Sequence, residues 1–140
     1  MNREKWRASI RRHEGLRLKP YTDTTQHLSI GYGRNLTDNG ISEEEADLLL
    51  EHDLDATEQA IRLAWLPFNG LDEVRQRAVA EMGFNLGIPG LMKFHGMLGA
   101  LEAGDYGLAA AHALNSLWAA QVGLRARRLA RMLLTGEDPV

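Results

Sequence analysis

The chain has 140 residues, of which 44% are hydrophobic and 25% charged, with a formal net charge of −3 and no cysteine. These numbers suit one soluble globular domain, or two small lobes that share a helix. They exclude a disulfide framework and argue against a dedicated nucleic-acid binder. No stretch is long and apolar enough to cross a bilayer, and the start MNREKWRASIRRHEG lacks the apolar core of a signal peptide.

The first predicted element is a helix over residues 3–14. Trp6, Ile10 and His13 follow one another at helical spacing, and Gly15 stands where many helices end in a left-handed residue. Glu14 therefore lies in the last turn of this helix.

A strand pattern replaces the helical one between Leu16 and about Leu36. In LSIGYG, residues 28–33, apolar side chains alternate with serine or glycine, as in a strand that has one small face. The polar segment Asp23–His27 before it predicts a hairpin turn, and Asp38–Gly40 predicts a second turn.

A long helix and then several shorter ones are predicted for the rest of the chain. Ser42 and Glu45 form a capping box that opens a helix extending to about Ala64. Further helices follow WLPFNG, with breaks at Gly87–Gly90, Gly104 and Gly123. The fold class predicted from these elements is α+β, mostly helical.

Two carboxylates and a hydroxyl lie close together in the sequence around the small strand face. The negative end of the helix dipole disfavours a charge on Glu14, which suits a group that must hold and deliver a proton. Asp23 lies at a polar turn and should stay ionised, and Ser29 shares its strand face with glycines. This pattern fits an acid/base pair. The spacing alone favours a simpler interpretation, a capped helix end, a turn aspartate and a tight hairpin, because aspartates are common in turns.

Longer motifs resemble the phage-type lysozymes, the endolysins of glycoside hydrolase family 24. The resemblance lies in EGLRLK (residues 14–19) with Tyr21, Asp23-Thr24, Ile30-Gly31 and Gly33, and continues in DLDA (53–56), LDEVRQRAVAEMGFNLG (71–87) and SLWAAQVGLRARR (116–128). It covers nearly the whole chain in the right order. The implied architecture is a single lysozyme domain, residues 1–140. Its N-terminal lobe spans about 13–64, including a β-hairpin and the connecting helix, and its helical C-terminal lobe spans about 65–140 together with the helix 3–14.

The resemblance also implies roles for individual residues. The general acid is Glu14, the second carboxylate is Asp23, and the hydroxyl that helps to hold the attacking water is Ser29, where the familiar family residue is threonine. The residues expected to contact the sugar chain are Phe84, Asn85, Gly31 and Arg125, the last facing the catalytic glutamate across the cleft. From spacing alone, Phe84 could equally be a core residue.

The implied activity is hydrolysis of the β-1,4 bond between N-acetylmuramic acid and N-acetylglucosamine in peptidoglycan, by inversion, for host cell lysis. We expect no metal or organic cofactor, no nucleic-acid or membrane partner, and a monomer. The expected location is the host cytoplasm, with access to peptidoglycan after membrane permeabilisation.

Two other hypotheses remain open from the sequence. The arginines at positions 62, 75, 77, 125, 127, 128 and 131 could form basic patches that bind nucleic acid or another anionic polymer. A catalytically inactive wall-binding relative is the other alternative.

The family pattern further predicts an ion pair between Arg34 and Asp53 that ties the hairpin to the long helix.

Overall fold

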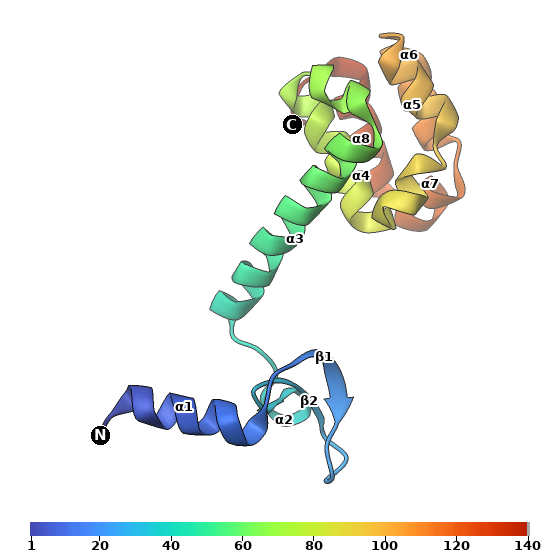
Figure 1. Cartoon of the computed structure of the whole chain (residues 1–140). Coiled ribbons are helices and arrows are strands. Elements are labelled where there is room, and N and C mark those ends of the chain that lie inside the picture. The colour runs from blue at the N-terminus through green and yellow to red at the C-terminus, as the bar shows by residue number, and fades with distance from the viewer. Residues whose placement is uncertain (140) are drawn as a thin grey trace. The chain divides into compact units, whose positions relative to one another are not determined.

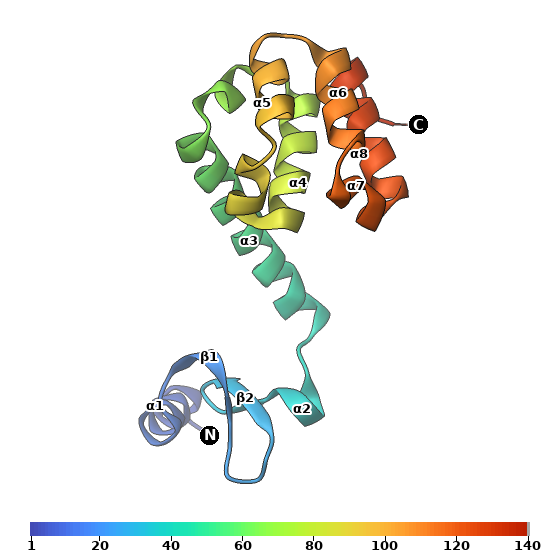
Figure 2. The same cartoon turned by 90° about the vertical axis from the view of Figure 1, so that its right-hand side faces the viewer.

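The computed structural model describes residues 1–139. The chain divides into two compact units, Met1–Leu49 and a second unit that begins at Leu50. The division falls inside the long helix α3 (Glu43–Ala64). Figures 1 and 2 show this helix. The first unit contains a small sheet and the second is helical, which confirms the predicted α+β class. The lobe boundaries given above stay a prediction.

The first unit begins with α1 (Arg3–Glu14), as predicted. The Asn2 side chain accepts a hydrogen bond from the backbone N–H of Lys5 at 2.9 Å, which caps the helix. At the other end Gly15 has φ 71° and ψ 164°, and its N–H donates to the Arg11 carbonyl at 3.1 Å. The glycine therefore ends the helix and turns the chain into the sheet.

The sheet contains three antiparallel strands in the order β1-β2-β3, namely β1 (Arg17–Thr22), β2 (Leu28–Gly31) and β3 (Arg34–Asn35). The predicted hairpin turn is confirmed, because β1 ends before Asp23 and the Asp23 N–H donates to the His27 carbonyl at 2.8 Å. The short third strand lacked a sequence signal. It places Asn35 beside Ser29 in the register.

A short helix, α2 (Leu36–Asn39), stands where the sequence predicted only a turn. The Asn35 side chain accepts from the Asp38 N–H at 3.0 Å, and Gly40 follows with φ 58°. The capping box at the start of α3 is confirmed in both directions. The Ser42 hydroxyl accepts from the Glu45 N–H at 3.1 Å, and Glu45 Oε1 accepts from the Ser42 N–H at 2.9 Å.

The second unit contains the remaining helices: η1 (Leu66–Gly70), α4 (Glu73–Met92), α5 (His95–Glu102), α6 (Tyr106–Leu114), α7 (Leu117–Val122) and α8 (Leu124–Thr135). Gly104 and Gly123 separate helices, as predicted. The predicted break at Gly87–Gly90 is a kink at Gly87, φ 76° and ψ 162°, rather than the end of α4.

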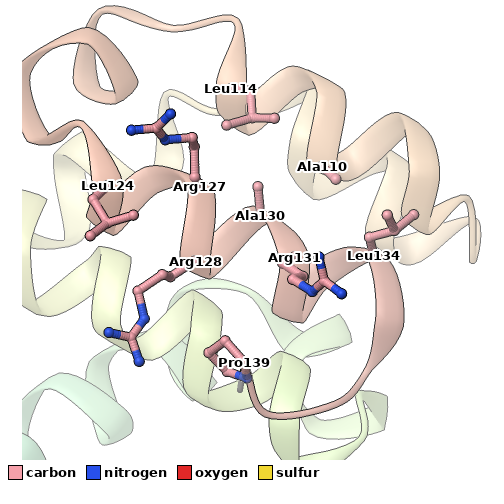
Figure 3. A pocket seen from close by; sticks show the side chains of 9 residues that line it. All are labelled: Ala110, Leu114, Leu124, Arg127, Arg128, Ala130, Arg131, Leu134 and Pro139. Carbon is pink, nitrogen blue, oxygen red and sulfur yellow. The ribbon is translucent and has the colours of Figure 1, made fainter.

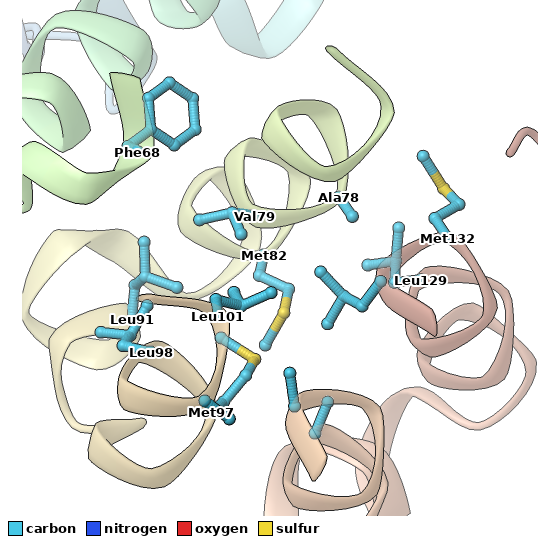
Figure 4. Close-up of a cluster of buried hydrophobic side chains, with 14 of the residues drawn as sticks. Phe68, Ala78, Val79, Met82, Leu91, Met97, Leu98, Leu101, Leu129 and Met132 are labelled. Carbon is cyan, nitrogen blue, oxygen red and sulfur yellow. The ribbon is translucent and has the colours of Figure 1, made fainter. Parts of the chain in front are cut away.

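The hydrophobic core lies in this second unit (Figure 4). Met82 and Val79 of α4, Met97 of α5 and Leu133 of α8 are almost fully buried. Phe94 meets Trp118 edge to face, with ring centroids 6.2 Å apart. This packing fixes the helices that carry the site residues of the second unit.

Candidate active site

Glu14 is the last residue of α1, and its carboxylate lies against the turn between β2 and β3. A Cβ atom built on Gly33 would lie 3.0 Å from Glu14 Oε2 and 3.2 Å from Glu14 Cδ. Gly33 also has φ 81°, a conformation that side chains disfavour. The bare Cα of Gly33 therefore makes room for the Glu14 carboxylate, a contact that the sequence did not reveal.

Asp23 occupies the hairpin turn, where several hydrogen-bond donors surround its carboxylate. Its Oδ1 accepts three hydrogen bonds, from the Thr25 N–H at 2.8 Å, the Thr25 hydroxyl at 2.8 Å and the His27 N–H at 2.9 Å. The bond from the His27 backbone, followed by the Thr25 hydroxyl, holds the pKa of Asp23 below its ordinary value. Asp23 is thus held as a carboxylate, as expected.

Ser29 and Gly31 lie on β2, which follows both carboxyl groups in the sequence. Ser29 is 3% exposed and pairs across the sheet with Tyr21 on one side and Asn35 on the other. Gly31 pairs with Arg17 and has open space where a Cβ would stand. It lines a hollow of about 930 Å³ together with Gly33, Leu36 and neighbouring residues, all of the first unit.

The other predicted site residues belong to the second unit. Phe84 on α4 is 42% exposed, so the alternative that it is a core residue is wrong. Its neighbour Asn85 accepts a hydrogen bond from Trp118 Nε1 at 2.8 Å, a partner the sequence did not indicate. Arg125 on α8 donates through Nε to Glu81 Oε1 at 3.2 Å. The first unit thus contains Glu14, Asp23, Ser29 and Gly31, and the second contains Phe84, Asn85 and Arg125.

The predicted ion pair between Arg34 and Asp53 is wrong in its partner. The Arg34 guanidinium binds both carboxylate oxygens of Glu45, at 2.9 and 2.8 Å, and also donates to the Gly40 carbonyl at 3.2 Å. Arg34 lowers the pKa of Glu45 to about 2. Glu45 at the start of α3 is closer in sequence, and its capping-box geometry already holds its carboxylate in place.

The arginines of the basic-patch hypothesis divide into two groups. Four of them pair with carboxylates: Arg62 with Glu58, Arg75 with Asp72, Arg77 with Glu73 and Asp138, and Arg125 with Glu81. Arg127, Arg128 and Arg131 instead line a groove of about 780 Å³ on α8 (Figure 3). Its other walls are apolar: Ala110, Leu114, Leu124, Ala130, Leu134 and Pro139. Neither candidate catalytic carboxylate lines this groove.

Sequence reasoning missed two residues that hold Asp23. Neither Thr25 nor His27 is among the predicted site residues. Both lie within four residues of Asp23, so the signal was local: a turn aspartate followed by side chains that can donate hydrogen bonds. The orientation of those side chains depends on the turn geometry, where Gln26 has φ 67°.

Comparisons with known proteins show which proteins the chain is similar to. The family model described as phage lysozyme matches residues 11–131. The chain is 34% identical over 158 aligned positions to the pre-baseplate central spike protein Gp5 of Enterobacteria phage T4, which covers 91% of the chain and 27% of that protein. It is 28% identical over 153 positions to the probable T4-type lysozyme 2 of Dictyostelium discoideum and 25% identical to the probable T4-type lysozyme 1 of that organism. Each of these alignments covers 88% of the chain and 89% of the relative.

The extent of these matches decides the classification. The chain spans about a quarter of the length of the T4 spike protein, but most of the length of the two Dictyostelium lysozymes. The family model covers both units, from within α1 to within α8. The chain belongs to the phage lysozyme family.

Proposed function

We propose that the chain is a muramidase that hydrolyses the β-1,4 bond between N-acetylmuramic acid and N-acetylglucosamine in peptidoglycan. Membership in the phage lysozyme family, with T4-type lysozymes among its relatives, supports a glycoside hydrolase that acts on peptidoglycan. The observation that carries the proposal is that one small unit holds two carboxyl groups, Glu14 against Gly33 and Asp23 in a turn that donates three hydrogen bonds to it.

Glu14 is the proposed general acid. Its carboxyl group lies at the C-terminal end of α1. The carboxyl group lies next to Gly33, which has no side chain to displace it. In the proposed step Glu14 gives its proton to the glycosidic oxygen as the bond breaks, which lets the sugar leave as an alcohol.

Asp23 is the proposed base. Hydrogen bonds from His27 and Thr25 keep it ionised, so it can draw a proton from water and stabilise positive charge on the sugar ring. Ser29 is proposed to hold that water through its hydroxyl. Attack of water on the face opposite the leaving group predicts inversion at the anomeric carbon.

Phe84, Asn85, Gly31 and Arg125 are the proposed contacts for the glycan. The exposed ring of Phe84 offers an apolar surface for a sugar, and Trp118 holds the Asn85 amide in a fixed orientation. The proposal needs no metal ion or organic cofactor and treats the protein as a monomer.

Host cell lysis is the proposed role, with the protein reaching peptidoglycan from the host cytoplasm after the membrane is permeabilised. Within residues 1–139, none of the helices has the length and apolarity to cross a membrane. A second candidate role is as a part of a phage particle, because the 34% identical relative is named a central spike protein. Mass spectrometry of purified particles separates these two roles.

Clearing of a permeabilised Gram-negative cell suspension tests the activity. We expect clearing by the wild-type chain, and almost none by Glu14→Gln or Asp23→Asn. A wall-binding relative without activity would only sediment with the wall. A chain that acts through the arginines of α8 would bind nucleic acid and leave the suspension turbid, and either result would refute the proposal.

The anomeric configuration of the first product tests the mechanism. NMR of the reducing end, read before mutarotation, should show the α-anomer from the β-linked glycan. An initial β-anomer would mean retention. It would overturn the role of Asp23 as a base and leave Glu14 as the acid.

A further inference from the structure

We propose that Thr25, His27 and Asp38 form a positioning relay that holds the Asp23 carboxylate in one orientation. Thr25 touches Asp23, His27 touches Thr25, and Asp38 touches His27. The inference rests on the proposed function, because it concerns the carboxylate to which that function assigns the attacking water.

The first part of the relay distinguishes the two oxygens of Asp23. All three donors, the Thr25 N–H, the Thr25 hydroxyl and the His27 N–H, reach the same atom, Oδ1. A carboxylate oxygen has two lone pairs, so three donors saturate it. Among residues 1–139, the one side chain that reaches Oδ2 is His27, whose Nδ1 lies 3.7 Å away. Oδ2 is therefore the oxygen left to receive a proton from water.

The second part fixes the direction of the Thr25 hydroxyl. A hydroxyl group has one proton, and that of Thr25 is given to Asp23. Its oxygen lies 2.6 Å from His27 Nδ1, so it must accept a hydrogen bond from an Nδ1–H group. His27 thus prevents the hydroxyl from rotating toward the ring and away from Asp23.

Asp38 completes the relay from α2. Its Oδ2 lies 3.3 Å from His27 Nε2, which suits an Nε2–H donor. The ring of His27 therefore lies between Asp38 on one side and the Asp23–Thr25 pair on the other. Asn35 holds Asp38 in place, because its side chain donates to Asp38 Oδ2 at 2.9 Å and accepts from the Asp38 N–H at 3.0 Å.

The turn itself does not require these side chains. A turn of this kind needs only an aspartate oxygen and the backbone N–H two residues later. The Thr25 hydroxyl and the His27 ring add contacts beyond that minimum, and both side chains reach the solvent-accessible face of the turn. These added contacts fix the orientation of the Asp23 carboxylate. The orientation of the carboxylate in turn fixes where the attacking water can bind.

Substitution at Thr25 separates the hydroxyl from the shape of the side chain. Thr25→Val keeps the branched shape and removes the donor, whereas Thr25→Ser keeps the donor. The readouts are kcat and KM on soluble peptidoglycan fragments, and the pKa of Asp23 from an NMR titration of its carboxyl carbon. We expect Thr25→Val to raise the pKa of Asp23 and to lower kcat about tenfold with little change in KM. Thr25→Ser should match the wild type in both.

His27→Ala provides a second variant. It leaves the backbone N–H that reaches Asp23 and removes the ring that orients the hydroxyl. We expect kcat to fall, by less than in Thr25→Val, with KM again unchanged. Far-UV circular dichroism confirms that each variant is folded.

Several outcomes would overturn the relay. One is an unchanged pKa of Asp23 and unchanged kcat in Thr25→Val, with the wild type active. Another is an equal loss in Thr25→Ser and Thr25→Val, since the hydroxyl would then be irrelevant. If the wild type does not hydrolyse peptidoglycan, the proposed function fails. The titration of Asp23 then decides the relay by itself, because Thr25→Val must still raise that pKa and Thr25→Ser must not.

Discussion

At the scale of single residues, the Glu14 side chain carries the transferred proton in the proposed mechanism. Glu14→Gln keeps the shape of the side chain but cannot donate a proton to the glycosidic oxygen, so we expect the clearing rate to fall about 100-fold or more. The variant should melt at the same temperature as the wild type or higher, because a carboxylate at a helix C-terminus is disfavoured. Clearing assays and thermal melts measure both effects. Substantial activity in a folded Glu14→Gln variant would remove Glu14 from the mechanism.

The contact between Glu14 and Gly33 offers a more specific test. Gly33→Ala places a Cβ 3.0 Å from Glu14 Oε2, closer than an ordinary van der Waals contact, so the carboxylate must shift by a few tenths of an ångström. Gly40→Ala is the matched control, since Gly40 also has positive φ but has open space at the Cβ position. Both variants should lose similar stability from backbone strain, roughly 1–2 kcal/mol.

Activity should distinguish the two glycine variants. We expect Gly33→Ala to clear cells about tenfold more slowly than Gly40→Ala, because displacement of a catalytic group is costly. Urea unfolding and clearing rates on the same samples separate stability from activity. Equal activity in the two variants would show that the position of Glu14 against Gly33 is unimportant.

Ser29 is the one buried polar or charged residue among those that the structure describes. If its hydroxyl holds the attacking water, Ser29→Ala should lower the hydrolysis rate while folding and wall binding stay close to normal. Ser29→Thr keeps the hydroxyl and adds a branched side chain that suits a strand, so it should keep or raise activity. Kinetics and wall sedimentation measure these effects. Full activity in Ser29→Ala would mean that the site needs only a small residue there.

At the scale of elements, Glu45 joins the end of the sheet to the start of α3. It accepts from the Ser42 N–H and from both Arg34 nitrogens. These bonds lower the pKa of Glu45 from 4.5 to about 2 in the folded chain. A group whose pKa is lower in the folded state stabilises the fold above its unfolded pKa and loses that effect as the pH falls.

The pH dependence of stability should therefore change when Glu45 is replaced. Glu45→Gln should be less stable than the wild type above pH 4.5, and the difference should shrink as the pH falls toward 2. Glu44→Gln is the control, since it makes the same charge change one residue away. Urea midpoints across this pH range measure both. A difference from the wild type that stays constant with pH would show that Arg34 does not stabilise the ionised form of Glu45.

At the scale of the whole molecule, the net charge of −3 limits long-range attraction to an anionic cell wall. We expect the clearing rate to depend less steeply on ionic strength than that of a strongly basic lysozyme, because little attraction is there to be screened. Clearing rates over a salt series at constant pH, with a basic lysozyme in parallel, test this. A steep loss between low and moderate salt would indicate that a local basic surface, such as the groove of Arg127, Arg128 and Arg131, dominates the encounter.

The sequence by itself determined the features that depend on neighbouring residues. The limits of α1, its glycine end, the hairpin turn after Thr22 and the capping box of Ser42 and Glu45 all follow from backbone preferences and side chains a few positions apart. Such interactions exist in almost any fold that contains the segment. For this reason the fold class could also be predicted from the order of the elements.

Only the tertiary structure decided which distant groups meet. In the structure Arg34 binds Glu45 rather than Asp53, Gly33 lies against Glu14, and Trp118 donates a hydrogen bond to Asn85. Periodicity shows which face of an element a residue occupies, but not which other element comes to that face. That choice depends on loop geometry and on the packing of the whole unit, which no single segment contains.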